Sequence, residues 1–164
     1  INCKLSLNIE NTTMLTIEDL KLKIDNNSRL LGLDIGSKRI GISICDDKRT
    51  IATPLKTVDF INLNELILEL KKIINENNIK GLIIGHPINM DGSHGKSAQS
   101  ISDKSKVIEK EINIPVSLWD ERLSTSAAFN ISSQLDINIT KRTKNIDEKA
   151  ATFILQGAID YLNN

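Results

Sequence analysis

The chain of 164 residues has the length of one domain, and 40% of its residues are apolar while only 3% are aromatic. Aliphatic side chains must therefore fill its core. The 21 basic and 21 acidic residues balance, which argues against a protein that coats nucleic acid by charge alone but permits a local basic face. No apolar run approaches the length of a membrane span and no signal peptide opens the chain, so we expect a cytoplasmic protein without a membrane partner.

The two cysteines, Cys3 and Cys45, agree with that location. Neither has a CxxC partner, and two thiols do not make a disulfide framework. We therefore expect a reducing compartment, a core position for Cys45, and no zinc site.

The first 28 residues have the weakest pattern of the chain. Met14 is the first methionine, and the segment after it has helical spacing behind a candidate N-cap at Thr16. We expect residues 1–28 to be an N-terminal extension, with Met14 as a candidate natural start, and residues 29–164 to form the main domain.

Three strands are expected next. Leu30–Ile35 is an almost continuous apolar run, typical of a central strand. Arg39–Cys45 alternates isoleucines with small residues, which predicts a half-buried strand that forms an antiparallel hairpin with the first. Ile51–Val58 can return as a third strand, at the sheet edge because Pro54 has no N–H to donate.

Helices and strands alternate in the rest of the chain. The expected elements are a helix Leu63–Ile74, a strand Ile79–Gly85, a helix Ala98–Glu111, a strand Ile114–Asp120, a helix ending near Leu135, a polar and basic loop 136–145, and a final helix Asp147–Leu162. This order predicts an α/β domain with a mixed five-stranded sheet and helices on both faces.

Three acidic residues stand where elements end or in apolar surroundings. Asp34 lies inside the first strand, Glu121 follows the last strand, and Asp147 opens the final helix. If these carboxylates meet, their repulsion raises their pKa values unless a cation binds. Carboxylate oxygens select Mg²⁺ or Mn²⁺. Two such ions can stabilise the attacking oxygen and the leaving oxygen when a phosphodiester bond is cleaved.

Each acid also has a structural interpretation. Asp147 can serve the helix dipole at an N-terminus, and Asp34 can be a buried aspartate paired with an arginine. Asp120 and Glu121 can form a solvated strand end, or one of them can pair with Arg122. Asp120 is therefore an alternative to Glu121 as a metal ligand.

Candidate phosphate-binding groups lie in three loops. Lys38 and Arg39 stand between two glycines of the first hairpin, where backbone can approach a ligand, although an ordinary turn has the same pattern. In the long loop HPINMDGSHGKS, Asn89 and Ser93 can bond phosphate or sugar, and its two histidines have no ligand spacing and are interpreted as polar loop residues. Arg142 belongs to a basic run that precedes Asp147 and can hold a nucleic-acid backbone.

Several segments together resemble one known family, the YqgF or RuvX family of Holliday junction resolvase-like, pre-16S rRNA nucleases. The resemblance covers about residues 29–162 and is carried, in the family's order, by LLGLDIGSKRIGISICD, IATPLKTV, GHPINMDGS, WDERLSTSAA and DEKAATFILQGAIDYL.

The resemblance implies a ribonuclease H-like fold and a bacterial cytoplasmic protein that matures the 5′ end of 16S rRNA. It implies that Asp34, Glu121 and Asp147 bind the metal. Related resolvases carry a further acid on the fourth strand, whereas this strand ends in Gly85-His86, so the acid after the fifth strand has to serve instead. His86 replaces a common leucine and Lys96 a common proline of the family pattern.

The leading hypothesis is a Mg²⁺- or Mn²⁺-dependent endonuclease that acts on structured RNA, above all pre-16S rRNA, or on branched DNA. Asp34 would bridge the metal ions, and Lys38, Arg39 and Arg122 would position phosphate. A non-catalytic RNA-binding ribosome-assembly factor is one alternative. An actin-like ATPase or sugar kinase is another, against which the length of the chain argues. The sequence predicts neither the oligomeric state nor the number of metal ions.

Overall fold

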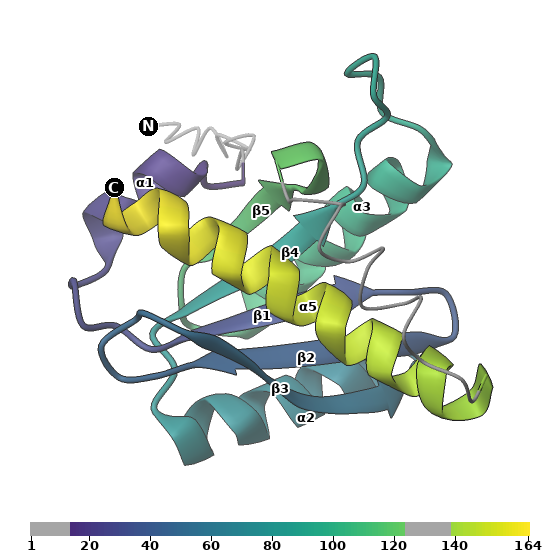
Figure 1. The fold of residues 1–164 in the computed structure, drawn as a ribbon, viewed down its shortest axis with the longest axis horizontal. Helices are drawn as coiled ribbons and strands as arrows, with labels where there is room; N and C mark the ends of the chain where they lie inside the picture. The colour runs from purple at the N-terminus through teal and green to yellow at the C-terminus, as the bar shows by residue number, and fades with distance from the viewer. Residues whose placement is uncertain (1–13, 124–138) are drawn as a thin grey trace, which may run out of the picture.

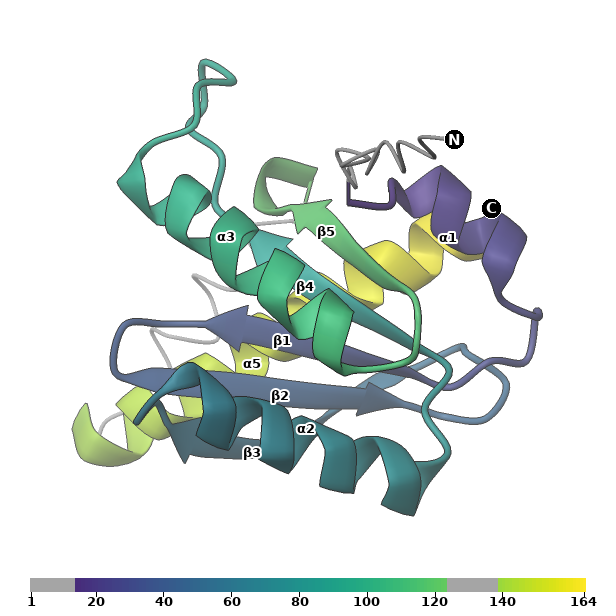
Figure 2. The same ribbon diagram turned by 180° about the vertical axis from the view of Figure 1, so that it is seen from behind.

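The structure is a computed structural model that describes residues 14–123 and 139–164, with side chains in the ranges 14–123 and 146–164. A single five-stranded sheet forms the middle layer of this part of the chain. One long helix crosses one face of the sheet (Figure 1), and two helices cover the other (Figure 2). None of the described helices is both long and apolar enough to span a bilayer.

The sheet is mixed, as predicted. Its strands are β1 (Leu30–Ile35), β2 (Arg39–Cys45), β3 (Ala52–Asp59), β4 (Gly81–His86) and β5 (Val116–Asp120), in the spatial order β3-β2-β1-β4-β5. β1 pairs antiparallel with β2 and parallel with β4, and β5 is parallel to β4. The carboxyl ends of β1, β4 and β5 therefore meet at one end of the sheet.

β2 is buried on both faces, whereas its alternation predicted burial on one. Ile40, Ile42 and Ile44 join the core beneath the pair of helices. The small residues between them are buried as well, because the long helix lies directly on them. Small side chains in this strand therefore mark a helix contact and not a solvent face.

β3 is the edge strand that Pro54 predicted. The register slips between β2 and β3, since Ile42 pairs with Lys56 but Ser43 pairs with Pro54. This leaves Leu55 as one extra residue, so the proline sits at a bulge, where its missing N–H does not interrupt a regular ladder.

The helices α2 (Leu63–Asn77) and α3 (Lys96–Glu111) cover the face shown in Figure 2. The side chain of Asn62 accepts a hydrogen bond from the N–H of Glu65 and so caps α2. Both helices bury their apolar stripes against β1, β2 and β4, as their spacing predicted.

The helix α5 (Ile139–Asn163) crosses the other face (Figure 1). The prediction of a loop over 136–145 is wrong from Ile139 onward, where the chain is helical. No glycine or proline interrupts residues 139–147, and lysine and arginine are good helix formers, so the helix extends beyond its apolar stripe. Asp147 consequently lies inside a helix and cannot serve as its N-terminal acid. Of the helix expected before Leu135, Glu121–Leu123 form a 3₁₀ turn, η1, and residues 124–138 lie outside the described part.

The helix α1 (Ile17–Lys23) begins at the predicted N-cap, where Thr16 and Asp19 form a capping box. Its Leu20 is fully buried in the core around α5, and the Tyr161 hydroxyl of α5 donates to Glu18. The division into an extension 1–28 and a domain 29–164 stays a prediction, although residues 15–24 pack against β5 and α5. Residues 1–13 lie outside the described part.

Candidate active site

Asp34 is the next-to-last residue of β1, on the strand face that α5 crosses. It pairs with Gly41 of β2. On its other side, Leu33 pairs with Ile84 of β4, so Asp34 lies beside Gly85, the next residue of β4. Its two flanking apolar neighbours turn to the opposite face and the larger core. The alternation of the strand thus directs the carboxylate toward α5.

Asp147 reaches the same place because α5 rests on Gly41. A Cβ at position 41 would overlap the backbone carbonyl of Asp147. One turn further along α5, the hydroxyl of Ser43 donates to the carbonyl of Ala151 at 2.7 Å. Any larger residue at position 41 would lift the helix from the sheet, so this glycine sets how closely Asp147 approaches Asp34.

Glu121 approaches from the third side. It opens η1, directly after β5, and a Cβ at position 85 of β4 would lie 2.5 Å from its Oε1. The carboxylate therefore covers Gly85, the neighbour of Asp34. The fourth strand carries no acid of its own, and the carboxylate of Glu121 lies over that strand.

The charges of these acids oppose one another. Burial, and then the charge of Asp147, raises the pKa of Asp34 from 3.8 to about 6. Burial, followed by the charges of Asp34 and Asp120, raises the pKa of Glu121 from 4.5 to about 7. The charge of Asp147 acts on Asp34, and the charge of Asp34 acts on Glu121. Asp34 is thus the acid coupled to both of the others and lies between them.

Asp147 also lies against a cation. The Nε of Arg39 is 3.0 Å from its Oδ2, within ion-pair range. The buried Oδ2 nevertheless accepts no hydrogen bond from any group that the structure describes, so the contact is electrostatic and poorly directed. The predicted arginine partner for an acid is therefore present, but it lies beside Asp147 instead of Asp34.

This arrangement can be tested for a fit to a divalent ion. As the side chains stand, no group of three acidic, histidine or cysteine residues in the described ranges lies close enough together to hold a metal ion. The donors are carboxylate oxygens only, two of the carboxyls have raised pKa values, and one buried oxygen lacks a hydrogen bond. A hard cation such as Mg²⁺ or Mn²⁺ would supply a positive charge to the two carboxyls and a partner to the unbonded oxygen. The residues therefore fit the ion in their chemistry, and the side chains would have to draw together to bind it.

Asp120, the alternative ligand, is already paired. The Nη2 of Arg122 lies 2.7 Å from its Oδ2, and Nε lies 3.0 Å from its Oδ1. These hydrogen bonds lower the pKa of Asp120. Arg122 therefore holds Asp120 as a two-pronged ion pair, while Glu121, one residue on, faces Asp34. The same pair occupies Arg122, which the sequence predicted to bind phosphate.

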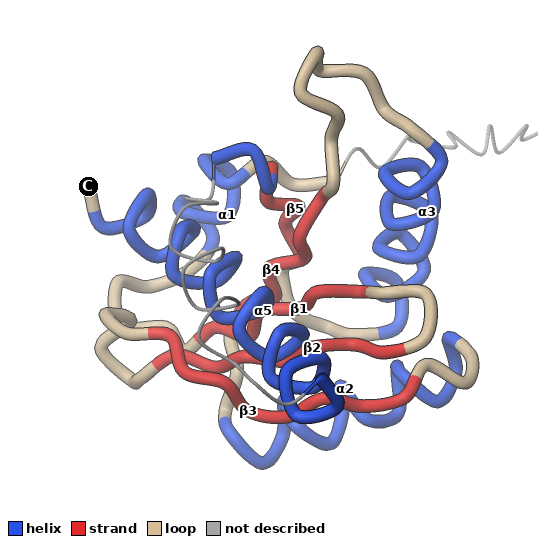
Figure 3. The backbone as a smooth tube through the Cα atoms, turned by 45° about the vertical axis from the view of Figure 1, so that its right-hand side comes forward, coloured by secondary structure: helices blue, strands red, loops and turns tan. Residues whose placement is uncertain are grey.

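The loop between β4 and α3 projects from the body of the domain (Figure 3). Residues at its tip form hydrogen bonds with one another. Asn89 Nδ2 donates to Ser93 Oγ at 3.0 Å, and Ser93 Oγ donates to Asp91 Oδ1 at 2.6 Å. Gly92 has φ +85°, the left-handed conformation that this tight turn needs. Asn89 and Ser93 are exposed, but their polar groups shape the turn.

His86 was interpreted as a polar loop residue, and this is wrong, because it is the buried last residue of β4. Its Nε2 lies 3.1 Å from the carbonyl oxygen of Ala98 in α3, and its ring meets that of His94 edge to face. It faces α3, on the side of the sheet away from the acids. The strand thus ends at His86, one residue beyond the prediction. A histidine ring can be buried there because it forms a hydrogen bond with the Ala98 carbonyl.

The remaining predicted residues differ in position. Lys38 is exposed in the β1–β2 turn, next to Arg39. The side chain of Arg142 lies outside the described part. Sequence reasoning missed that Gly41 and Gly85 position the acids. The signal was present, since both glycines are the small members of strands that are otherwise rich in isoleucine and leucine.

Comparison with solved structures gives the class of the fold. The chain is similar to RuvC of T. thermophilus in complex with a Holliday junction substrate, with a TM-score of 0.53 and 9% identity, over 79% of this chain and 91% of that one. At this identity the likeness concerns the fold alone. The fold is ribonuclease H-like, which confirms the prediction.

Sequence comparison gives the family. A family model described as RuvX, Holliday junction resolvase, matches residues 28–161, and the chain belongs to this family. A relative from Pelagibacter ubique, named for a pre-16S rRNA nuclease activity, is 63% identical over 151 residues, 92% of this chain and 100% of the relative. One of the same name from Rhodobacter capsulatus is 40% identical over 146 residues, 89% of this chain and 92% of the relative.

Proposed function

We propose that this member of a nuclease family hydrolyses phosphodiester bonds with Mg²⁺ or Mn²⁺, and that its substrate is pre-16S rRNA near its 5′ end, in the cytoplasm. The observation that carries the proposal is the buried Oδ2 of Asp147, which lacks a hydrogen bond beside two carboxyls of raised pKa. Arg39 lies against Asp147, but neither Asp34 nor Glu121 forms an ion pair with any residue in the described ranges. A protein that used these two acids only for stability would pair them, as it pairs Asp120 with Arg122.

Asp34, Glu121 and Asp147 are the residues that would hold the ion. When bound, the ion supplies an activated water and charge stabilisation at the phosphate. Arg39 limits the charge of the acidic group, since it already lies against Asp147. Lys38 is exposed beside it and is placed to orient the phosphate of the substrate.

The choice of RNA is supported by the names of the relatives from P. ubique and R. capsulatus. The family description favours a second candidate, a branched-DNA resolvase. Neither the fold nor the acids distinguish the two, because metal-assisted hydrolysis attacks a phosphodiester in either backbone.

The test compares a pre-16S rRNA transcript with a four-way DNA junction, each with Mg²⁺, Mn²⁺ or chelator. We expect the wild-type chain to cut the transcript near the 16S 5′ end only with metal, and Asp34→Asn to lose at least about 100-fold of the rate because the middle carboxylate is gone. Asp47→Asn removes an aspartate at the other end of the sheet and is the matched control.

Three outcomes would contradict the proposal. Junction cleavage without transcript cleavage would favour the resolvase. Transcript binding without cleavage in either metal would favour a non-catalytic assembly factor. Equal cleavage by wild type and Asp34→Asn would remove the acids from the mechanism.

A further inference from the structure

A small hollow lies at the carboxyl ends of β1 and β4, on the side of the sheet covered by α3. Its volume is about 250 Å³. The β1–β2 turn lines it with Gly36 and Ser37, and the first half of α3 lines it with Lys96, Ser97, Ser100 and Lys104. β1 is the strand at which the chain's path across the sheet changes direction, and ligands of open α/β sheets bind outside the carboxyl ends of strands at such points.

The hollow is lined by two lysines, Lys96 and Lys104, and no acidic residue in its lining neutralises their charge. Neither Lys96 nor Lys104 forms an ion pair with any residue in the described ranges. The Nζ of Lys104 lies 4.7 Å from the centre of the Phe60 ring. This contact holds the lysine in place and leaves its charge available to an anion.

Hydroxyl donors accompany the two cations. Lys96, Ser100 and Lys104 are spaced four residues apart and therefore share one side of α3. Ser97 and Ser37 add hydroxyls from the helix and from the opposing turn. Two ammonium groups with several hydroxyl donors are suited to the oxygens of a phosphate group.

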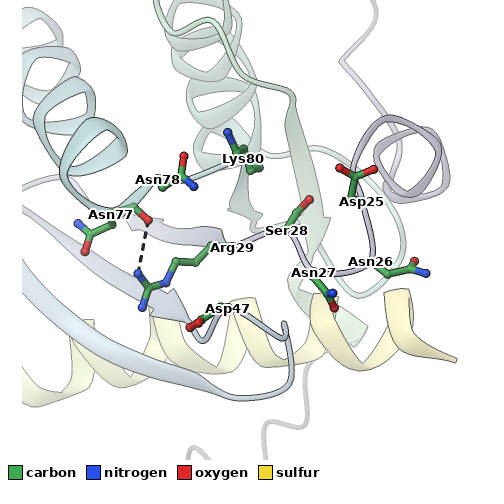
Figure 4. A pocket seen from close by; sticks show the side chains of 9 residues that line it. All are labelled: Asp25, Asn26, Asn27, Ser28, Arg29, Asp47, Asn77, Asn78 and Lys80. Carbon is green, nitrogen blue, oxygen red and sulfur yellow. Dashed lines mark hydrogen bonds between the residues drawn. The ribbon is translucent and has the colours of Figure 1, made fainter.

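A larger hollow at the opposite end of the sheet shows that lysine and arginine alone do not make such a site. It measures about 520 Å³, and Arg29 and Lys80 share it with Asp25 and Asp47 (Figure 4). Arg29 donates to backbone carbonyls there. Its two acids oppose an anion, so the basic hollow beside α3 is the one that selects phosphate.

We propose that the hollow beside α3 binds a backbone phosphate of the nucleic-acid substrate, at a position flanking the phosphate that is cleaved. The proposal rests on the proposed nuclease function. Asp34 lies two residues before Gly36, with its carboxylate on the α5 face, while the hollow opens on the α3 face. The backbone of the substrate therefore passes over the β1–β2 turn, from the acids on one face to the lysines on the other.

The experiment measures binding by fluorescence anisotropy, with the full chain, a labelled RNA hairpin with a single-stranded 5′ extension, and chelator to prevent cleavage. The variant is Lys96→Gln with Lys104→Gln. We expect Kd to rise about tenfold at low salt, and the slope of log Kd against log salt to fall by about one, the value for one lost phosphate contact.

The matched control is Lys106→Gln with Lys110→Gln, two exposed lysines of the same helix that do not line the hollow. Both double variants remove two positive charges, so long-range attraction falls equally in each. If both weaken binding to the same extent, or if neither does, the hollow is not a phosphate site. Unchanged circular dichroism melting curves exclude misfolding as the cause, because all four lysines lie on the helix surface.

Binding and cleavage separate this proposal from the nuclease proposal. If Asp34→Asn loses cleavage while the Lys96→Gln, Lys104→Gln double variant binds RNA normally, the phosphate site in the hollow is contradicted and the nuclease proposal stands. Absence of cleavage by the wild type, with the expected binding defect in the lysine variant, would overturn the nuclease and leave a phosphate-binding hollow.

Discussion

The two ends of the sheet treat the same residue type in opposite ways. At the amino end of β1, hydrogen bonds from the N–H of Ile51 and from Thr50 hold the pKa of Asp46 at about 2. At the carboxyl end of the same strand, burial and the charge of Asp147 raise the pKa of Asp34 to about 6. Asp46 is hydrogen-bonded by its own protein, whereas Asp34 forms no ion pair with any residue in the described ranges.

Arginines show the same difference. Arg49, buried near the amino end of β1, donates to Asn163 and to the carbonyl of Asp25, and Arg29 donates to two carbonyls. At the other end, Arg39 lies beside a carboxylate oxygen without satisfying it. The amino end is therefore arranged for stability, and the carboxyl end keeps unsatisfied groups that a ligand can use, at the expense of stability.

The largest effect is expected at Gly41, where close contact with the backbone of α5 positions Asp147 near Asp34. Gly41→Ala places a Cβ against the carbonyl of Asp147, and neither backbone can yield easily. We expect a displacement of α5 that lowers cleavage by about 100-fold or more, and a loss of stability of about 1–3 kcal/mol from overpacking. Cleavage rates and urea unfolding measure the two effects.

Gly95→Ala is the control for that change, since a Cβ at position 95 meets only the side chain of Asn89 at 3.4 Å or more. Normal cleavage by Gly41→Ala would mean that the close contact between α5 and β2 is not needed to position Asp147 for cleavage.

The pH dependence of stability tests the difference between the ends directly. The folded pKa of Asp34 is raised from 3.8 to about 6, so the folded chain holds its proton longer than the unfolded chain does. Stability in chelator should therefore fall as pH rises from about 4 to 7, by roughly 3 kcal/mol for Asp34, and that contribution should be absent in Asp34→Asn. Urea unfolding at a series of pH values measures it.

Added Mg²⁺ or Mn²⁺ should restore stability at pH 7.5 but have little effect at pH 5, where protons already neutralise the acids. Asp47→Asn should leave the whole profile as in the wild type. A wild-type profile without the fall between pH 4 and 7 would show that the acids are not strained in the folded chain.

The smallest effects are expected from a matched pair of arginine substitutions, one at each end of β1. Arg29→Met removes hydrogen bonds to the carbonyls of Cys45 and Asn77, and it should lower stability by about 1–2 kcal/mol with cleavage unchanged. Arg39→Met removes a half-exposed ion pair and should change stability by less than about 1 kcal/mol while it slows cleavage. The reverse pattern, in unfolding and cleavage assays, would contradict the division between the ends.

Much of the fold was predictable because the strands carry simple patterns. The apolar run of β1, the alternation of β2 and the proline of β3 each identify a strand, and two of them also identify its place in the sheet. The start of α5 was not predictable from periodicity, since residues 139–145 have no apolar stripe and are helical only as an extension of the packed segment.

The acids could be named from the sequence, but their surroundings could not. Whether Asp120 or Glu121 faces Asp34 depends on η1, whose turn directs the second acid over β4 and leaves the first to Arg122. The small residues of β2 look like a solvent face until α5 is placed on them. Information of this kind lies in the packing of distant elements and not in any one segment.

The order in which the acids occur along the chain has a consequence for synthesis. Asp34 comes from the first strand and Glu121 from the turn after the fifth strand, but Asp147 belongs to α5, which is made after all five strands. A growing chain that still lacks this helix holds two of the three proposed ligands and has an uncovered sheet face. The proposed cutting activity would therefore begin only once α5 has been made and has packed on β2, and RNA near the ribosome would be protected from an unfinished copy.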